Sequence, residues 1–99
     1  MARIDIGPSA KADLARIVAD MRGRGRDRAA DELEAELGVV LHRLAAFPET
    51  GSPRPGLGLG VRSAAVRPYV VLHEYDRTTD TVSVLRVLHG RRRLSLDAP

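Results

Sequence analysis

Residues 61–93 read VRSAAVRPYVVLHEYDRTTDTVSVLRVLHGRRR, and this stretch carries the strongest structural signal in the chain. Two runs rich in Val, Leu and Tyr, residues 69–75 and 82–88, flank a polar turn at residues 76–80. Apolar, β-branched runs bounded by Asp and Thr are typical of a β-hairpin. A third run, residues 61–66, comes just before and can pair as a neighbouring strand. The stretch therefore predicts three antiparallel strands, the last of which leads into a histidine, a glycine and three arginines.

Two amphipathic helices are predicted upstream of these strands. The first, residues 10–22, follows Ser9, which is a good N-cap. Its apolar stripe consists of Ala10, Leu14, Ile17, Val18 and Met21. The charged residues that lie off this stripe are Lys11, Asp13, Arg16 and Asp20. The second helix, residues 27–46, has an apolar stripe of Ala30, Leu33, Leu37, Val40, Leu41 and Leu44. We expect the residues between this helix and the sheet to be Leu33, Leu37, Leu41 and Leu44.

The predicted element order is β-α-α-β-β-β, which indicates an α+β fold. Residues 1–6 alternate weakly and predict a short first strand. We expect a small antiparallel sheet with the two-helix hairpin packed on one face, and a single domain over residues 1–99. Seven of the thirteen residues in 48–60 are Pro or Gly, which predicts a long loop of the kind that is often functional or mobile.

Strand alternation sorts the hairpin residues onto two faces, if the turn centres on Thr78. The more apolar set, expected to pack on the helices, is Val70, Leu72, Glu74, Val82, Val84, Arg86 and Leu88. The other set is Arg67, Tyr69, Val71, His73, Tyr75, Ser83, Leu85, Val87 and His89. This second face is half apolar and half polar. It is therefore either a docking surface for a partner segment or a face that the chain's own termini cover.

The composition excludes several kinds of site. There is no cysteine, which excludes a disulfide framework and a thiolate metal site and suits a reducing cytoplasm. We find neither a membrane span nor a secretory leader. His42, His73 and His89 lie on different predicted elements, so we expect no metal site, and no motif indicates a cofactor.

Positive charge is concentrated in the second half of the chain. The net charge is +3, but residues 54–93 contain eight arginines against only Glu74, Asp76 and Asp80. Arginine suits bidentate contact with carboxylate or phosphate. The predicted helices have acidic outer faces and the chain has three aromatic residues, so we do not expect it to bind DNA independently.

Residues 53–92 also carry a family pattern. A Pro/Gly-rich loop, a Gly-x-Arg strand start and a Pro-Tyr strand precede the sequence Val-Leu-Arg-Val-Leu-His-Gly-Arg-Arg. The residues that carry the pattern are Pro53, Gly56, Gly60, Arg62, Pro68, Tyr69, Tyr75, Val84, Leu85, Arg86, Val87, Leu88, His89, Gly90, Arg91 and Arg92. This order resembles the ParE branch of the RelE/ParE superfamily, the toxins of type II toxin–antitoxin pairs, over nearly the whole chain. One position departs from it, since the family often has Asp after the arginine pair and this chain has Arg93.

The resemblance implies a toxin that stalls DNA gyrase on cleaved DNA without catalysis of its own, and that a ParD-like antitoxin holds inactive. The residues expected to contact the target or the antitoxin are Arg62, Arg67, Tyr69, His73, Tyr75, His89, Arg91 and Arg92. Two alternatives stay open: a RelE-like ribosome-dependent mRNA endoribonuclease, and a degenerate toxin kept for complex formation. The nuclease would use His89, Arg86 and Arg67 for proton transfer and charge stabilisation. The basic cluster lacks a convincing acid–base set, which favours the gyrase inhibitor.

Overall fold

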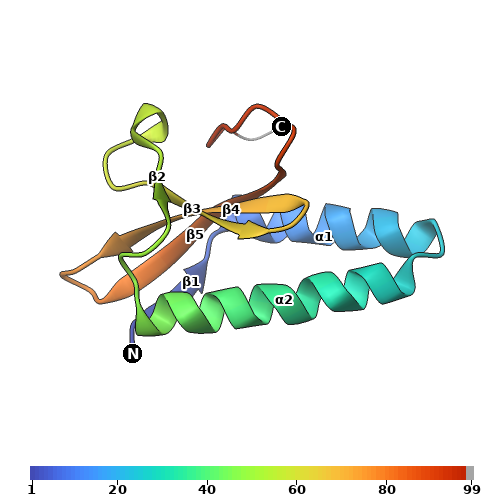
Figure 1. Ribbon diagram of the computed structural model, residues 1–99, viewed down its shortest axis with the longest axis horizontal. Coiled ribbons are helices and arrows are strands. Elements are labelled where there is room, and N and C mark those ends of the chain that lie inside the picture. The colour runs from blue at the N-terminus through green and yellow to red at the C-terminus, as the bar shows by residue number, and fades with distance from the viewer. Residues whose placement is uncertain (98–99) are drawn as a thin grey trace.

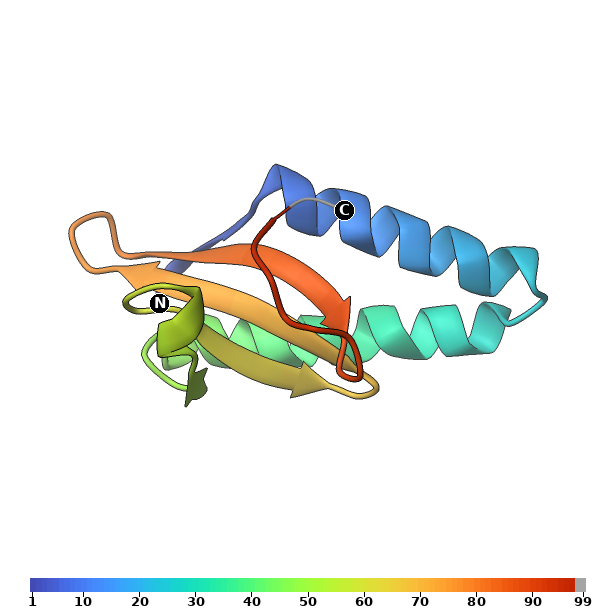
Figure 2. The same cartoon turned by 90° about the horizontal axis from the view of Figure 1, so that it is seen from above.

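The computed structural model describes residues 1–97 and confirms the predicted α+β fold (Figure 1). In chain order the elements are β1 (Arg3–Ile6), α1 (Pro8–Gly23), α2 (Asp27–Ala46), β2 (Ser52–Pro53), the 3-10 helix η1 (Pro55–Leu57), β3 (Arg62–Val66), β4 (Tyr69–Asp76) and β5 (Thr81–His89). The two helices lie side by side on one face of the sheet, while η1 and the C-terminal segment lie over the other face (Figures 1 and 2).

The helices form where their apolar stripes predict them. In α2, Leu33, Leu37 and Leu44 are buried, and Leu41 is half-buried against the same core. α1 begins at Pro8 and its N-cap is Gly7, with no side-chain cap bond, so the prediction of Ser9 as the cap is wrong. Proline suits the first helical position because its φ is already helical and its missing N–H would have no helical partner there.

The sheet is mixed rather than wholly antiparallel, with the strand order β1-β5-β4-β3-β2. β1 runs parallel to β5, from Arg3 opposite Thr81 to Ile6 opposite Val84, and the other pairs are antiparallel. Alternation identifies a strand but not the direction of its neighbour, and β1 meets a strand from the other end of the chain. The short β2 lies inside the predicted loop and forms the opposite edge of the sheet.

The hairpin register differs from the predicted one by one residue. Asp76 pairs with Thr81, so the turn holds four residues, and Asp80 adopts a left-handed φ of 49°. The side chain of Asp76 accepts the Thr78 N–H at 2.8 Å and fixes the start of the turn. Further along, Leu85 has no partner, because Leu72 pairs with Arg86 while His73 pairs with Val84. This bulge shifts the pairing register and changes which side chains at the end of β5 face the helices.

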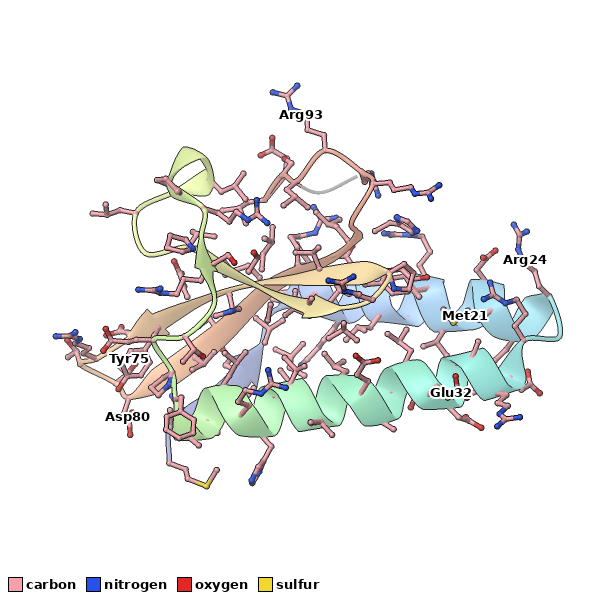
Figure 3. The ribbon with its side chains drawn as sticks, in the orientation of Figure 1. Met21, Arg24, Glu32, Tyr75, Asp80 and Arg93 are labelled. Carbon is pink, nitrogen blue, oxygen red and sulfur yellow. The ribbon has the colours of Figure 1, made fainter. Side chains whose placement is uncertain are left out.

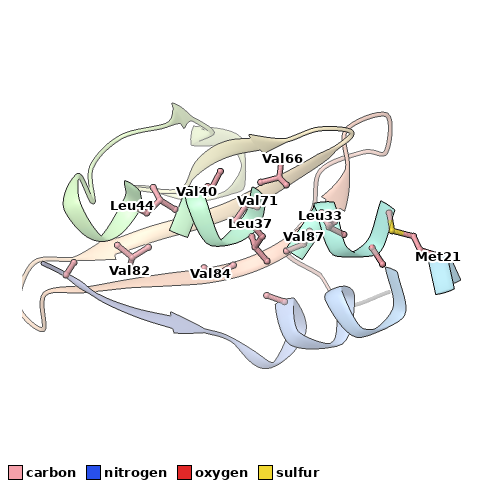
Figure 4. Close-up of a cluster of buried hydrophobic side chains, with 13 residues drawn as sticks. Met21, Leu33, Leu37, Val40, Leu44, Val66, Val71, Val82, Val84 and Val87 are labelled. Carbon is pink, nitrogen blue, oxygen red and sulfur yellow. The ribbon is translucent and has the colours of Figure 1, made fainter. Parts of the chain in front are cut away.

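The predicted faces are therefore wrong for β4 and for the end of β5. The side chains that pack on the helices include Val71 of β4 and Val82, Val84 and Val87 of β5 (Figure 4). Tyr69 and Tyr75 of β4 are partly buried against the same cluster. The prediction was right for Val82 and Val84, which precede the bulge. The rest failed because β4 is apolar on both sides, so alternation alone could not rank its faces.

The far face of the sheet is covered by the chain itself. Val61, Leu72 and Leu88 are buried although they lie outside the cluster that faces the helices. The segment around η1 and the residues after β5 pass over this face (Figure 2). Both sequence-based alternatives were stated for the face of Tyr69, Val71 and Tyr75, which instead packs on the helices, while the side that the chain's own segments cover carries Leu72 and Leu88, which were predicted to face the helices.

Candidate functional site

The end of β5 is held against the turn between β3 and β4. The Gly90 N–H donates to the Pro68 carbonyl at 2.8 Å, and the Arg92 N–H donates to the His89 carbonyl at 2.9 Å. A Cβ on residue 90 would lie 3.2 Å from the Pro68 oxygen, so a side chain there would crowd the turn. The sequence Gly-Arg-Arg-Arg therefore leaves the sheet from a defined position.

Four of the predicted contact residues meet at this point. Arg67, Tyr69, His89 and Arg91 line one hollow at the end of the sheet. Tyr69 pairs with His89 across the two strands, and their rings meet edge to face with centroids 5.6 Å apart. The structure thus brings together residues from two turns that are more than twenty positions apart in the sequence.

The hydrogen bonding of His89 limits its chemistry. Its Nδ1 accepts the Arg91 N–H at 3.1 Å, which places the proton of the neutral ring on Nε2. The lone pair of the neutral ring is thereby engaged, so His89 is arranged to donate a hydrogen bond rather than to act as a general base.

Arg92 and Arg93 lie next to this hollow. They line a second hollow together with η1 residues and the segment 94–97, and Arg93 projects away from the sheet (Figure 3). We call Arg67, Arg91, Arg92 and Arg93 the arginine surface. All four side chains are exposed, and none forms an ion pair with any residue between 1 and 97.

Arg86, by contrast, is buried in an ion pair with Asp13 of α1. Its Nε donates to Asp13 Oδ2 at 2.7 Å and its Nη2 donates to Oδ1 at 2.9 Å. Asp13 also accepts the Val87 N–H at 3.0 Å, and Arg86 donates a further hydrogen bond to the Asp97 carbonyl. All three guanidinium nitrogens hydrogen-bond within the chain and the side chain is buried, so Arg86 joins α1, β5 and the C-terminal segment and cannot reach a substrate.

The charge of Asp13 is stabilised by this network. Burial alone would raise the pKa of Asp13, but hydrogen bonds from Arg86, the Val87 N–H and Arg16 outweigh it and hold the pKa below its usual value. The hydrogen bond that Arg86 donates to Asp13 likewise raises the pKa of Arg86. Both groups are therefore ionised at neutral pH.

His73 and Arg62 lie away from the arginine surface. The His73 ring is fully buried, and neither nitrogen has a hydrogen-bond partner among residues 1–97. Burial, with a smaller effect of the Arg62 charge, lowers the pKa of His73 to about 4, so the ring is neutral at pH 7. Gly51 covers it, since a Cβ there would lie 3.0 Å from His73 Nε2. His73 is thus a core residue, while Arg62 donates to the Gly51 carbonyl at 3.3 Å.

Tyr75 lies at the hairpin end of the sheet (Figure 3). Its ring packs against the core, and its hydroxyl donates to Asp80 Oδ1 at 2.7 Å, which raises the pKa of Tyr75. The predicted contact residues therefore divide into two groups. One gathers at the end of β5, and the other (Arg62, His73, Tyr75) lies toward the opposite end of β4.

Comparison with known proteins shows the family. The family model described as "ParE toxin of type II toxin-antitoxin system, parDE" matches residues 4–94. The chain belongs to the ParE toxin family. Toxin ParE3 of Caulobacter vibrioides is 35% identical to it over 83 residues, which cover 84% of this chain and 81% of that protein. The predicted family is therefore confirmed.

Two solved structures have the same fold as this ParE-family chain. The chromosomal ParDE toxin–antitoxin system from P. aeruginosa aligns with a TM-score of 0.71 and 18% identity, over 90% of this chain and 96% of that one. The RelBE2 toxin–antitoxin complex from Mycobacterium tuberculosis aligns with a TM-score of 0.59 and 22% identity, over 89% and 96% of the two chains.

Two features of this ParE-family chain were missed from the sequence. Asp13 looks like a surface acid of α1, and nothing local indicates that it is buried with Arg86. The second feature is an apolar groove between the helices, lined by Leu14, Ala15, Val18, Ala19, Glu34 and Leu37. Its signal was available, because Leu14 and Val18 belong to the predicted apolar stripe of α1 and remain only partly buried in the structure.

The described residues give no sign of a membrane span or of a metal centre. No helix within residues 1–97 is long and apolar enough to cross a bilayer. The same residues contain no group of three or more acidic or histidine side chains placed to hold a metal ion.

Proposed function

We propose that this ParE-family chain is an active toxin that inhibits DNA gyrase in the cytoplasm without catalysis of its own, and that a ParD-like antitoxin neutralises it. The observation that carries the proposal is the family match over residues 4–94, a range that includes the end of β5 and the three arginines after it. Inhibition of gyrase is the activity that membership of this family implies.

The chemistry of the site supports binding rather than catalysis. Metal-free RNA cleavage needs a general base, a general acid and cations around the phosphorane. Arg86 is engaged by Asp13, His73 is buried, and the lone pair of neutral His89 is occupied. What remains exposed is the arginine surface, which supplies charge and hydrogen-bond donors but no base.

The RelE-like ribonuclease remains the competing function. One observation favours it: His89 and Arg67 line the same hollow, as an acid and a charge-stabilising group would. Arg86, the third residue assigned to that mechanism, is not part of the hollow.

The groove between α1 and α2 is our proposed contact for the antitoxin. Its walls are mostly apolar side chains, whereas the far face of the sheet is already covered by the chain's own segments. An amphipathic antitoxin segment would bury its apolar side there at about 25 cal/mol per Å², while acidic residues would be attracted to the arginines. Related folds are described as ParDE and RelBE2 toxin–antitoxin systems, which supports an antitoxin partner.

Growth arrest on induction tests this function in cells. Arg91→Ala/Arg92→Ala should abolish arrest and leave folding intact, whereas His89→Ala should still arrest growth. Arg24→Ala/Arg28→Ala removes the same charge from the exposed helix ends and serves as the matched control, with arrest retained. Co-expression with the product of the neighbouring gene should restore growth through a stable complex. Loss of arrest in His89→Ala alone would favour the nuclease, where proton transfer is worth about 10²–10⁴-fold.

A further inference from the structure

We propose that the arginine surface binds the backbone phosphates of a DNA strand, so that the toxin touches the DNA in the gyrase–DNA complex. The identity of that complex rests on the proposed function, but the contact with DNA is a property of the chain itself and can be measured alone. The sequence did not lead us to expect binding to free DNA. The reason for revising that expectation is that arginines from two separate turns lie together.

The charge of the arginine surface is not neutralised by neighbouring acids. Some exposed arginines elsewhere are matched by acids, as where Arg77 forms two hydrogen bonds, at 3.0 and 2.8 Å, with Glu49, while others, such as Arg3, Arg26 and Arg43, are unpaired within residues 1–97 but are single charges apart from this cluster. Arg67, Arg91, Arg92 and Arg93 have no such partner among residues 1–97, although they crowd one end of the sheet. Guanidinium groups match phosphate oxygens in a bidentate geometry, and a strand of phosphates would neutralise several of them together.

The surface between the charges also suits a nucleic-acid strand. The hollow that Arg67 and Arg91 border is lined in addition by Pro68, Tyr69, Val70 and His89. Exposed guanidinium groups and the partly exposed His89 ring can stack with bases of any sequence. We see no fixed set of groups there that would read base edges, so the expected binding is independent of sequence.

The lining of the hollow favours a nucleic acid over an acidic peptide. Both edges of β4 are paired, with β3 and with β5, and only a short stretch of β3 beyond Ser63 lacks a partner strand, so little strand edge is left to align a peptide backbone. A nucleic-acid strand needs no such edge, because its contacts are phosphates and bases. An acidic peptide would have the α1–α2 groove as a better apolar surface.

Acidic residues set the direction of the strand. On its other side, Arg67 lines a third hollow together with Arg26 and with Glu32 and Glu36 of α2. The two carboxylates there would offset the arginines and disfavour phosphates on the helix side. The strand would therefore pass from Arg67 over residues 91–93, away from the helices.

Fluorescence anisotropy with a labelled 15-nucleotide single strand, measured between 50 and 200 mM salt, tests the contact. A sequence-independent contact of this kind has a dissociation constant of about 10⁻⁴–10⁻⁶ M, and each phosphate contact contributes about 0.7 to the slope of log K against log salt. Arg91→Ala/Arg92→Ala/Arg93→Ala should lower the slope by about 2 and weaken binding by at least about tenfold at 50 mM salt. Arg22→Ala/Arg24→Ala/Arg28→Ala removes the same charge from the helices and should change affinity by less than about threefold. Circular dichroism confirms that both variants are folded.

Three results would overturn the proposal: no binding by the wild-type chain at 50 mM salt, equal loss in the two triple variants, or displacement of the strand by a polyglutamate peptide of equal charge as readily as by unlabelled DNA. The last result would identify an acidic-peptide site instead.

Gyrase assays separate this proposal from the proposed function. Binding to DNA without any effect on gyrase would refute the proposed function and leave the DNA contact standing. If the triple variant no longer binds DNA but still inhibits gyrase fully, then the DNA contact is not needed for inhibition.

Discussion

Replacing Asp13 by alanine should cost a large share of the stability of the fold. Asp13 is 0% exposed and accepts hydrogen bonds from Arg86 and from the Val87 N–H, so the substitution leaves a buried guanidinium and a strand N–H without their acceptor. Breaking a buried pair by removing one partner costs about 3–5 kcal/mol. The lost acceptor for Val87 accounts for about 1–3 kcal/mol of that figure. A small domain has only about 5–15 kcal/mol in total.

Urea denaturation at pH 7, followed by circular dichroism, measures the effect of Asp13→Ala. With a slope of about 1–3 kcal/mol per M, the midpoint should fall by at least about 1 M. Asp20→Ala is the control, because Asp20 is an exposed acid of the same helix that meets Arg24 at the surface, and it should cost less than about 1 kcal/mol. Asp13→Leu combined with Arg86→Met should recover much of the loss, since apolar replacement of a whole buried pair is often neutral. An Asp13→Ala midpoint equal to that of Asp20→Ala would refute the reasoning.

The same pair predicts how stability responds to acid. The pKa of Asp13 is lowered in the folded chain, so the unfolded chain binds the proton more readily. Its contribution is therefore present above the unfolded pKa of about 3.9 and is lost as the pH falls below that value. In Asp13→Leu/Arg86→Met the free energy of unfolding should fall less steeply below pH 4 than in the wild type.

Three other predictions concern the core and the loop that covers His73. His73→Leu should flatten the dependence of the free energy of unfolding on pH between 6.5 and 4. The pKa of His73 is lowered in the folded chain, so the wild-type fold loses up to about 3 kcal/mol over that range as the histidine of the unfolded chain takes up its proton. An unchanged pH profile would show that the ring is not buried as a neutral group. Leu37→Ala should cost about 2–5 kcal/mol in urea denaturation, and an unchanged midpoint would mean that Leu37 does not face the sheet. Gly51→Ala should lower the thermal midpoint, since residue 51 has a φ of +107° and a Cβ there would lie 2.8 Å from the Ser63 oxygen, and a midpoint equal to the wild type would contradict that geometry.

Elements with a one-sided apolar pattern were predictable, and those buried on two sides were not. The stripe through Leu33, Leu37 and Leu44 identifies both α2 and its buried face, because one side of that helix meets solvent. In β4, Val70 and Val71 are equally apolar, so the helix-facing side depends on the turn at Asp80 and on the bulge at Leu85. Neither irregularity has a pattern in the sequence that fixes its position.

The candidate site was predictable where the signal was local. The run after His89 indicated a concentration of charge, and the structure places it at the end of the sheet with Arg67. The role of Arg86 was not predictable, since its partner Asp13 lies on a helix far away in the sequence and resembles any exposed acid. Tyr75 and His73 were assigned to a contact surface because β4 is apolar on both sides and its faces could not be ranked; in the structure Tyr75 packs against the core and His73 is fully buried.

Gyrase supercoiling in the presence of the purified chain tests the central claim most directly, with cleavage of ribosome-bound message measured on the same preparation. We expect supercoiling to stop and cleaved DNA to accumulate, while the message stays intact. The double variant Arg91→Ala/Arg92→Ala should allow supercoiling to continue. Cleavage of the message by the wild-type chain, with gyrase supercoiling normally in its presence, would contradict the account.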